Sequence, residues 1–100
     1  MLKHIVMWKL KEFAEGKTKA ENALIMKESL ERLVGIVPEI ISLQVGINEK
    51  ESDMAYDAVL ISTFANAEAL ARYKVHPEHV KVSDYCKKIR EGRVFVDFHE

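Results

Sequence analysis

The chain has 100 residues, 48% of them hydrophobic, and a formal net charge of −1. This length predicts a single domain over residues 1–100, and the composition excludes a disordered chain. The charge excludes the basic surface that nucleic-acid binding needs, and the apolar runs are too short to span a membrane. The single cysteine, Cys86, excludes an internal disulfide and a multi-cysteine zinc site. A cytoplasmic protein is therefore expected.

The first half of the chain predicts a strand, a helix and a second strand. Residues 2–10 carry apolar side chains at both parities, which is typical of a strand covered on both sides. Residues 11–17 are expected to form a charged connection. Thr18 and Glu21 form a capping box, so a helix is expected to begin there and to end near Val34, with Gly35 at its C-terminal cap. Residues 40–48 alternate between apolar and polar and predict the second strand.

The second half predicts a third strand, a broken helix and a last strand. Residues 56–64 predict the strand, and Asn66 is suited to cap a short helix that ends near Lys74. Pro77 interrupts that helix and is well placed as the first residue of another one. Gly92 is expected to end this second piece, and residues 93–99 are expected to form the last strand.

The order β-α-β-β-α-β predicts an α+β, ferredoxin-like fold, in which helices cover one face of a four-stranded antiparallel sheet. Several strands nevertheless offer apolar side chains to both faces, and an uncovered apolar face of that size usually marks an interface. The simplest cover is a second copy of the same sheet. We therefore expect a homodimer, a dimeric α/β barrel, that forms through the open sheet face, with Ile5, Met7, Val59, Ile61, Val94 and Val96 in the interface.

The corner from Tyr73 to Val80 holds the highest density of proton-active side chains and is expected to border a pocket. A histidine of near-neutral pKa is suited to act as a general base, and a tyrosine hydroxyl can donate to an oxyanion. His79 and Tyr73 are therefore the candidate catalytic pair. The alternative is that His79 braces the helix break and that Tyr73 is a core aromatic. His76 and His79 could share a metal, but His76 is better explained as a helix cap, and neither a metal nor an organic cofactor is predicted.

Further residues are assigned to the pocket from strand parity. His4 shares a strand face with Val6 and Trp8, and it is expected to line the pocket. Asp97 either binds a helix N-terminus or polarises a histidine, and Cys86 is expected to be an inert buried thiol. Arg90 and Arg93 either attract a carboxylate or are solvated. The full set expected to line the pocket is His4, Val6, Trp8, Ala58, Leu60, His76, Phe95 and Asp97.

Five segments together resemble one known family, the stress-responsive α/β-barrel (Dabb) domain, over nearly the whole chain. They are the opening strand 3–10, the turn Val37-Pro38 before a strand ending in Gly46, the strand 56–64, the corner 73–80 and the closing strand 93–98. The resemblance implies a ferredoxin-like homodimer. The most specific part of the resemblance is the histidine–proline corner after the second helix, together with the histidine of the first strand.

A plant branch of that family, the olivetolic acid cyclase type, closes a linear polyketide by an aldol condensation without a cofactor. Its catalytic tyrosine and histidine resemble Tyr73 and His79, and its strand-one histidine resembles His4. Two further polar pocket residues of that branch fall where this chain has Ser29 and Ala58.

Three functions are compatible with these features. The first is a cofactor-independent cyclase, lyase or isomerase that acts on a small molecule. The second is a non-catalytic dimeric protein that binds a ligand or is associated with stress. The third is a cofactor-independent monooxygenase, since one fold hosts many functions.

Overall fold

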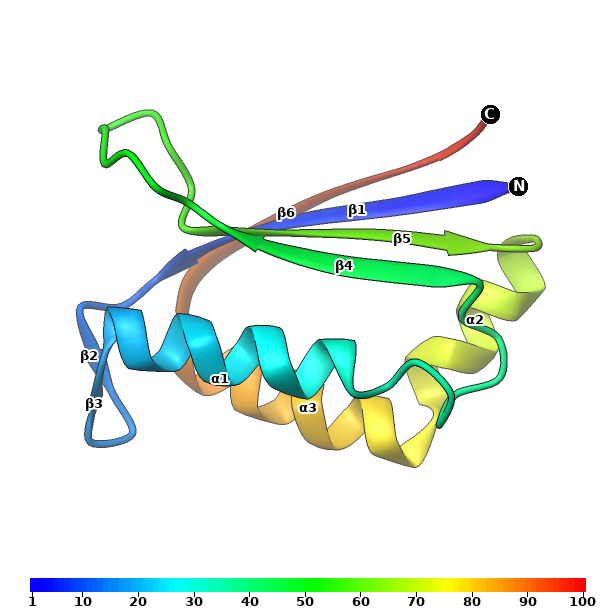
Figure 1. The fold of residues 1–100 in the computed structure, drawn as a ribbon, viewed down its shortest axis with the longest axis horizontal. Helices are drawn as coiled ribbons and strands as arrows, with labels where there is room; N and C mark the ends of the chain where they lie inside the picture. Colours follow the sequence, from blue (N-terminus) through cyan, green and yellow to red (C-terminus); the bar gives the residue numbers. More distant parts are fainter.

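The computed structural model describes residues 1–100 as one sheet with all its helices on one side (Figure 1). The elements in chain order are β1 Leu2–Leu10, β2 Phe13–Ala14, β3 Lys17–Thr18, α1 Lys19–Glu31, β4 Ser42–Ile47, β5 Ala58–Phe64, α2 Ala67–Val75, α3 Pro77–Ile89 and β6 Arg90–His99. The main sheet is antiparallel with the order β4-β5-β1-β6. The predicted ferredoxin-like architecture is confirmed. None of the helices is long and apolar enough to cross a membrane.

Strand β1 lies in the centre of the sheet, and its register decides which residues share the helix-covered face. Val6 stands opposite Leu60 of β5 on one side and opposite Phe95 of β6 on the other. Its neighbour on the same face, His4, stands opposite Asp97. Because side chains alternate along a strand, even-numbered residues of β1 point to the helices. All five of these are buried: Leu2, His4, Val6, Trp8 and Leu10.

Helix α1 begins as the sequence predicts and ends earlier. The Thr18 hydroxyl accepts from the Glu21 N–H, and the Glu21 carboxylate accepts from the Thr18 N–H, so both halves of the capping box are formed. The helix ends at Glu31, because the chain then turns to bury Leu33 together with Val37. Val34, expected on the buried face, is 47% exposed. Gly35 has a φ of 87°, and it serves this turn instead of capping the helix directly.

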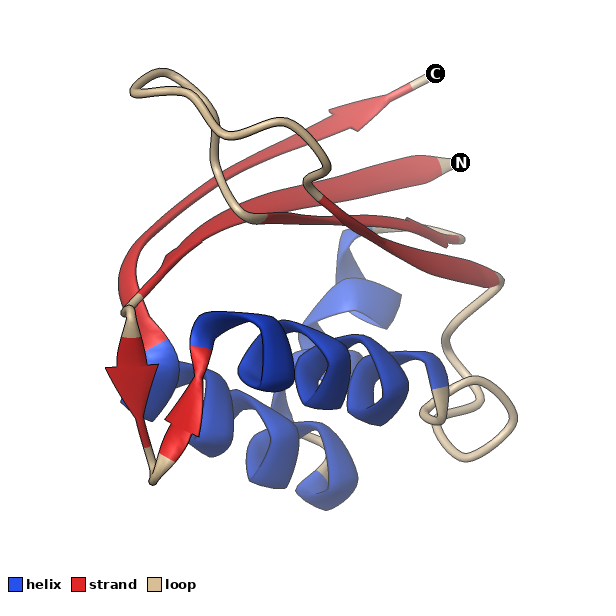
Figure 2. Ribbon diagram, turned by 60° about the vertical axis from the view of Figure 1, so that its left-hand side comes forward, coloured by secondary structure: helices blue, strands red, loops and turns tan.

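The connection after β1 also differs from the expectation, because it contains the small β2–β3 hairpin. Phe13 pairs with Thr18 and Ala14 with Lys17. Gly16 has a φ of 73° at the turn, a conformation that glycine adopts without strain. The hairpin leads directly into the cap of α1. Figure 2 shows it at the end of the sheet, beside the start of α1.

The helix break falls at the predicted corner, and a side chain caps the N-terminus of each of the two helices that it separates. The Asn66 carboxamide oxygen accepts from the Ala69 N–H at 2.9 Å at the start of α2. His76 is extended, ends α2, and accepts at Nδ1 from the Glu78 N–H at 3.1 Å. Pro77 is the first residue of α3. The break places the last turn of α2 against the first turn of α3, which brings the rings of Tyr73 and His79 into contact at an interplanar angle of 42°.

The junction between α3 and β6 corrects the expectation for Gly92. Helix α3 ends at Ile89, and β6 begins at Arg90 without a loop. Gly92 lies inside the strand, opposite Lys9, and therefore does not end the helix. The physical reason is the pairing of Leu10 with Arg90 across a bulge, which draws the chain into the sheet three residues early.

No helix lies on the opposite face of the sheet, where the loop between β4 and β5 rises at one end (Figure 2). Ile5 and Val59 are half-buried there. Five further large apolar side chains on this face are exposed by 40–53%: Met7, Ile61, Val94, Val96 and Phe98.

Candidate functional site

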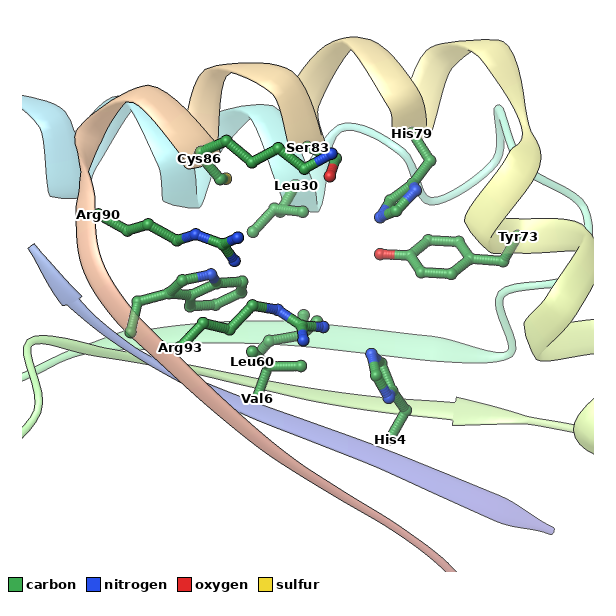
Figure 3. A pocket seen from close by; sticks show the side chains of 12 residues that line it. His4, Val6, Leu30, Leu60, Tyr73, His79, Ser83, Cys86, Arg90 and Arg93 are labelled. Atoms are coloured by element: carbon green, nitrogen blue, oxygen red, sulfur yellow. The ribbon is translucent and has the colours of Figure 1, made fainter.

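A cavity of about 170 Å³ lies between the helix-covered face of the sheet and the helices. Side chains from β1, β5, β6 and all three helices form its wall, and Figure 3 shows them converging on one space. The lining residues are His4, Val6, Trp8, Leu30, Leu60, Tyr73, His79, Ser83, Cys86, Lys87, Arg90 and Arg93.

Tyr73 places an unpartnered hydroxyl on this wall. The residue is only 1% exposed, and its phenol oxygen has no hydrogen-bond partner within the protein. Its ring packs against Phe64 at 4.9 Å and against the His79 imidazole at 4.2 Å between centroids. Burial raises the pKa of Tyr73, so the side chain is a neutral phenol at physiological pH. A buried hydroxyl without a partner is rare, and it is available to donate to a ligand.

His79 enters the cavity with a defined tautomer. Its Nδ1 lies 3.1 Å from the main-chain oxygen of Lys74. A carbonyl oxygen only accepts, so Nδ1 carries the proton and donates, and Nε2 keeps its lone pair on the cavity side (Figure 3). Burial, aided by the nearby charges of Arg93 and Lys74, lowers the pKa of His79 despite the raising effect of that hydrogen bond. The imidazole is therefore neutral at pH 7 and can accept a proton.

His4 approaches the same space from the sheet, and a carboxylate orients it. Its Nδ1 lies 2.5 Å from Asp97 Oδ1, on the strand directly opposite. The Nδ1–H donates to the carboxylate, which leaves Nε2 toward the cavity. Burial lowers the pKa of His4, although Asp97 acts to raise it. The two histidines thus offer two unprotonated nitrogens on either side of the Tyr73 hydroxyl.

The other end of the cavity is cationic. Lys87, Arg90 and Arg93 line it, and no aspartate or glutamate is among the lining residues. Figure 3 shows both guanidinium groups directed into the cavity, across from Tyr73 and His79. Cys86 is also on the wall, and burial raises its pKa to about 11, so it is a thiol and not a reactive thiolate.

Nine of the residues singled out from the sequence meet at this cavity: His4, Val6, Trp8, Leu60, Tyr73, His79, Cys86, Arg90 and Arg93. Asp97 stands behind His4 and does not line the wall. Ala58 is buried opposite Trp8, beyond the end of the cavity, and His76 is occupied with capping α3. Phe95 shares the helix-covered face but is 58% exposed, because β6 is an edge strand with no neighbour to cover it.

Three lining residues were not singled out from the sequence, namely Leu30, Ser83 and Lys87. A helical pattern could have found two of them. Ser83 and Lys87 follow His79 at spacings of four and eight residues, which places all three on one face of α3. No comparable signal pointed to Leu30, which reads as an ordinary core residue of α1.

A family model described as the stress responsive A/B barrel domain matches residues 2–100. A dimeric protein of unknown function and ferredoxin-like fold from Bacteroides fragilis is 27% identical, with a TM-score of 0.78 over 99% of this chain and 95% of its own. No curated protein matches the chain at a significant level.

Two more distant structures share the fold alone. A hydroxynitrile lyase from Passiflora edulis is 15% identical, with a TM-score of 0.79 over 97% of this chain and 90% of its own. An antibiotic biosynthesis monooxygenase is 16% identical, with a TM-score of 0.76 over 100% of this chain and 98% of its own.

Proposed function

Since this chain belongs to the stress-responsive A/B barrel domain family, we propose that it binds a small carbonyl compound and acts on it by acid–base chemistry without an organic cofactor. One observation carries the proposal. The Tyr73 hydroxyl is buried without a partner beside the His79 imidazole, whose cavity-side nitrogen is unprotonated. A hydrogen-bond donor and a base then face the same bound group.

The reaction that these groups support starts with removal of a proton beside a carbonyl. The substrate oxygen accepts a hydrogen bond from the Tyr73 hydroxyl, and His79 Nε2 takes the proton from the adjacent carbon. The electron pair moves into an enolate, whose negative oxygen Tyr73 stabilises. Positioned bases contribute roughly 10²–10⁴ in rate, and removal of one oxyanion donor costs about 10²–10³. Aldol-type cyclisation, keto–enol isomerisation and elimination of a group beta to the carbonyl by a lyase all share this step.

The size of the cavity restricts the substrate. A cavity of about 150 Å³ holds one benzene molecule, and the cavity here is about 170 Å³. The occupant is therefore a molecule of about six to eight non-hydrogen atoms, by the same comparison. A short acyl compound fits this space better than a linear polyketide. The aldol-type chemistry of the plant branch is then proposed here for a smaller substrate.

Exchange of carbon-bound protons tests the proposal directly. Butanone and levulinate are incubated with the protein in deuterated buffer, and incorporation of deuterium beside the carbonyl is followed by NMR. We expect exchange above the buffer rate, and a loss of about a hundredfold in His79→Asn and in Tyr73→Phe. His99→Gln is the matched control, because His99 is exposed and lies off the cavity. A folded His79→Asn protein that exchanges at the wild-type rate would overturn the proposal.

A second candidate is a non-catalytic binding protein, and one observation favours it. Both pocket histidines have their Nδ1 protons engaged within the protein, which is also the arrangement expected of purely structural residues. Saturable binding of the ketones with no exchange at all would support this function over catalysis.

We also propose that the chain forms a homodimer through its open sheet face. Homologues of the same fold are dimeric proteins. The exposed apolar side chains on that face, with Ile5 and Val59 between them, support a second copy as its cover.

A further inference from the structure

The cationic end of the cavity has no assigned role in the acid–base chemistry above. We infer that Arg90 and Arg93 form a carboxylate subsite, so that the substrate is a small oxo acid whose carbonyl meets Tyr73 and His79. The subsite is argued from its own residues, and only the reaction at the other end depends on the proposed function.

The charges at this end are not neutralised within the protein. None of the protein's eight salt bridges includes Lys87, Arg90 or Arg93. The carboxylate nearest to the wall, Asp97, already accepts from His4. A cavity that is lined by three cations and no carboxylate concentrates anions.

Stabilisation of the helix dipole by cations explains only some of the basic residues at this end of the cavity. Cations near a helix C-terminus stabilise its dipole, which accounts for Lys87 and Arg90 at the end of α3. Lys88 sits in the same turn, faces away from the cavity and lies 3.9 Å from Glu15. Arg93 lies on β6, outside the helix, and stacks on the Phe95 ring at 5.2 Å with its guanidinium directed into the cavity (Figure 3). Burial and the charge of Arg90 lower the pKa of Arg93, and Asp97 raises it by less than Arg90 lowers it, so the two guanidinium groups repel each other. An anion between them would relieve this repulsion.

The form of the subsite favours a carboxylate over a phosphate. Guanidinium groups bind a flat carboxylate through two parallel hydrogen bonds. The C-terminal end of α3 carries a partial negative charge, which disfavours a dianion at this position. No helix N-terminus lines this end of the cavity to supply N–H donors to a phosphate. A monoanion that also carries a ketone can then span the cavity from Arg90 and Arg93 to Tyr73.

The single tryptophan provides a direct binding signal. Trp8 is buried on the cavity wall, so its emission reports an occupant. Levulinate is titrated against wild-type protein, followed by levulinamide, its neutral amide of equal size, and by inorganic phosphate. We expect levulinate to bind, and levulinamide and phosphate each to bind at least about tenfold more weakly, the cost of about one lost charged hydrogen bond. Raising the NaCl concentration tenfold weakens levulinate binding, because the subsite is open to solvent.

Variants separate the subsite from general charge effects. Arg90→Gln and Arg93→Gln each weaken levulinate binding about tenfold and leave levulinamide binding unchanged. Lys88→Gln is the matched control, because it removes one charge from the same helix end without changing the cavity wall. Equal affinity of the wild type for levulinate and levulinamide would overturn the subsite, and so would tighter binding of phosphate than of levulinate.

The two proposals fail in different ways. In one outcome, His79-dependent exchange of the butanone protons is observed, but levulinate binds no better than levulinamide. This outcome would contradict the subsite and leave the acid–base function standing. Arginine-dependent binding of levulinate without proton exchange would contradict the acid–base function and support the subsite.

Discussion

At the residue scale, the two pocket histidines are held in the same tautomer by different means. His4 donates its Nδ1 proton to a carboxylate, whereas His79 donates to a main-chain oxygen. A carboxylate stabilises the charged imidazolium ring more than a carbonyl oxygen does, because the carboxylate is itself charged. His4 is therefore the better place to keep a transferred proton, whereas His79 is the base that lies next to the Tyr73 hydrogen-bond donor.

The pH dependence of activity follows from the same burial. Because burial lowers the pKa of His79, its free base persists below the ordinary histidine value of about 6.5. We expect the exchange rate to stay constant from pH 8 down to about pH 6.5 and to fall below it. The measurement is kcat/KM for deuterium exchange against pH. A fall that already begins above pH 7 would contradict a neutral His79.

Stability should fall over the same acidic range. The folded pKa values of His4 and His79 lie below the unfolded value, so the unfolded chain binds more protons as the pH drops. Their contribution is complete above about pH 6.5 and is lost as the pH falls toward the folded pKa, with a slope of up to about 1.4 kcal/mol per pH unit for each histidine. Urea denaturation at several pH values measures this. In His79→Asn the free energy of unfolding is expected to change less steeply with pH. An unchanged slope would show that the buried His79 does not cause this pH dependence.

Two tyrosines allow a sharp comparison of stability. The Tyr73 hydroxyl is buried without a partner, whereas the Tyr85 hydroxyl donates to the buried Asn22 carboxamide at 2.5 Å. An unsatisfied buried group costs roughly 1–3 kcal/mol, and a hydrogen bond contributes about 1 kcal/mol net. Tyr73→Phe should therefore raise the free energy of unfolding by about 1 kcal/mol while it slows exchange about a hundredfold, and Tyr85→Phe should lower the free energy of unfolding by about as much. Destabilisation by Tyr73→Phe would show that the hydroxyl has a partner.

At the scale of the elements, the helix break sets the geometry of the site. Tyr73 lies in the last turn of α2 and His79 in the first turn of α3, so the angle between the two helices fixes the distance between donor and base. His76 maintains that angle through its bond to the Glu78 N–H. His76 therefore acts on the chemistry through position alone, because it does not itself line the cavity.

Substitution at His76 tests this role. His76→Ala removes the cap and should lower the free energy of unfolding by about 1 kcal/mol. It should also reduce exchange by loosening the contact between Tyr73 and His79. His76→Asn keeps a capping oxygen and should restore both quantities toward the wild type. If His76→Asn is as impaired as His76→Ala, the imidazole does more than cap the helix.

The sequence was sufficient to predict each main element, and it failed where partners far along the chain decide a boundary. The capping box at Thr18 and the break at Pro77 are local signals, and both helices begin where those signals place them. The start of β6 depends on pairing between Leu10 and Arg90, which no local pattern contains. The same limit applies to the candidate site. Tyr73, His79 and His4 could be predicted from side-chain chemistry and strand parity, whereas the prediction of Leu30 would have required knowledge of how α1 packs.

At the scale of the whole molecule, the exposed apolar face should determine assembly. Val96 is 53% exposed on that face, on the edge strand β6, and a charge there is incompatible with burial between two sheets. Val96→Asp should convert a wild-type dimer into a monomer in sedimentation or light scattering. Phe13→Asp is the control, because Phe13 is 73% exposed on the β2–β3 hairpin, away from the face. A Val96→Asp protein that remains dimeric would refute this interface.

The direct passage from α3 into β6 also limits how this protein can evolve. Along β6, Arg93, Phe95 and Asp97 face the helices, while Val94, Val96 and Phe98 face outward. A shift of one residue would exchange the two sets, because side chains alternate strictly along a strand. From Gly92 to His99 the pairing with β1 contains neither a loop nor a bulge that could absorb such a shift. Relatives that keep both the site and the dimer should therefore differ in this segment by replacement of residues and never by a single inserted or deleted one.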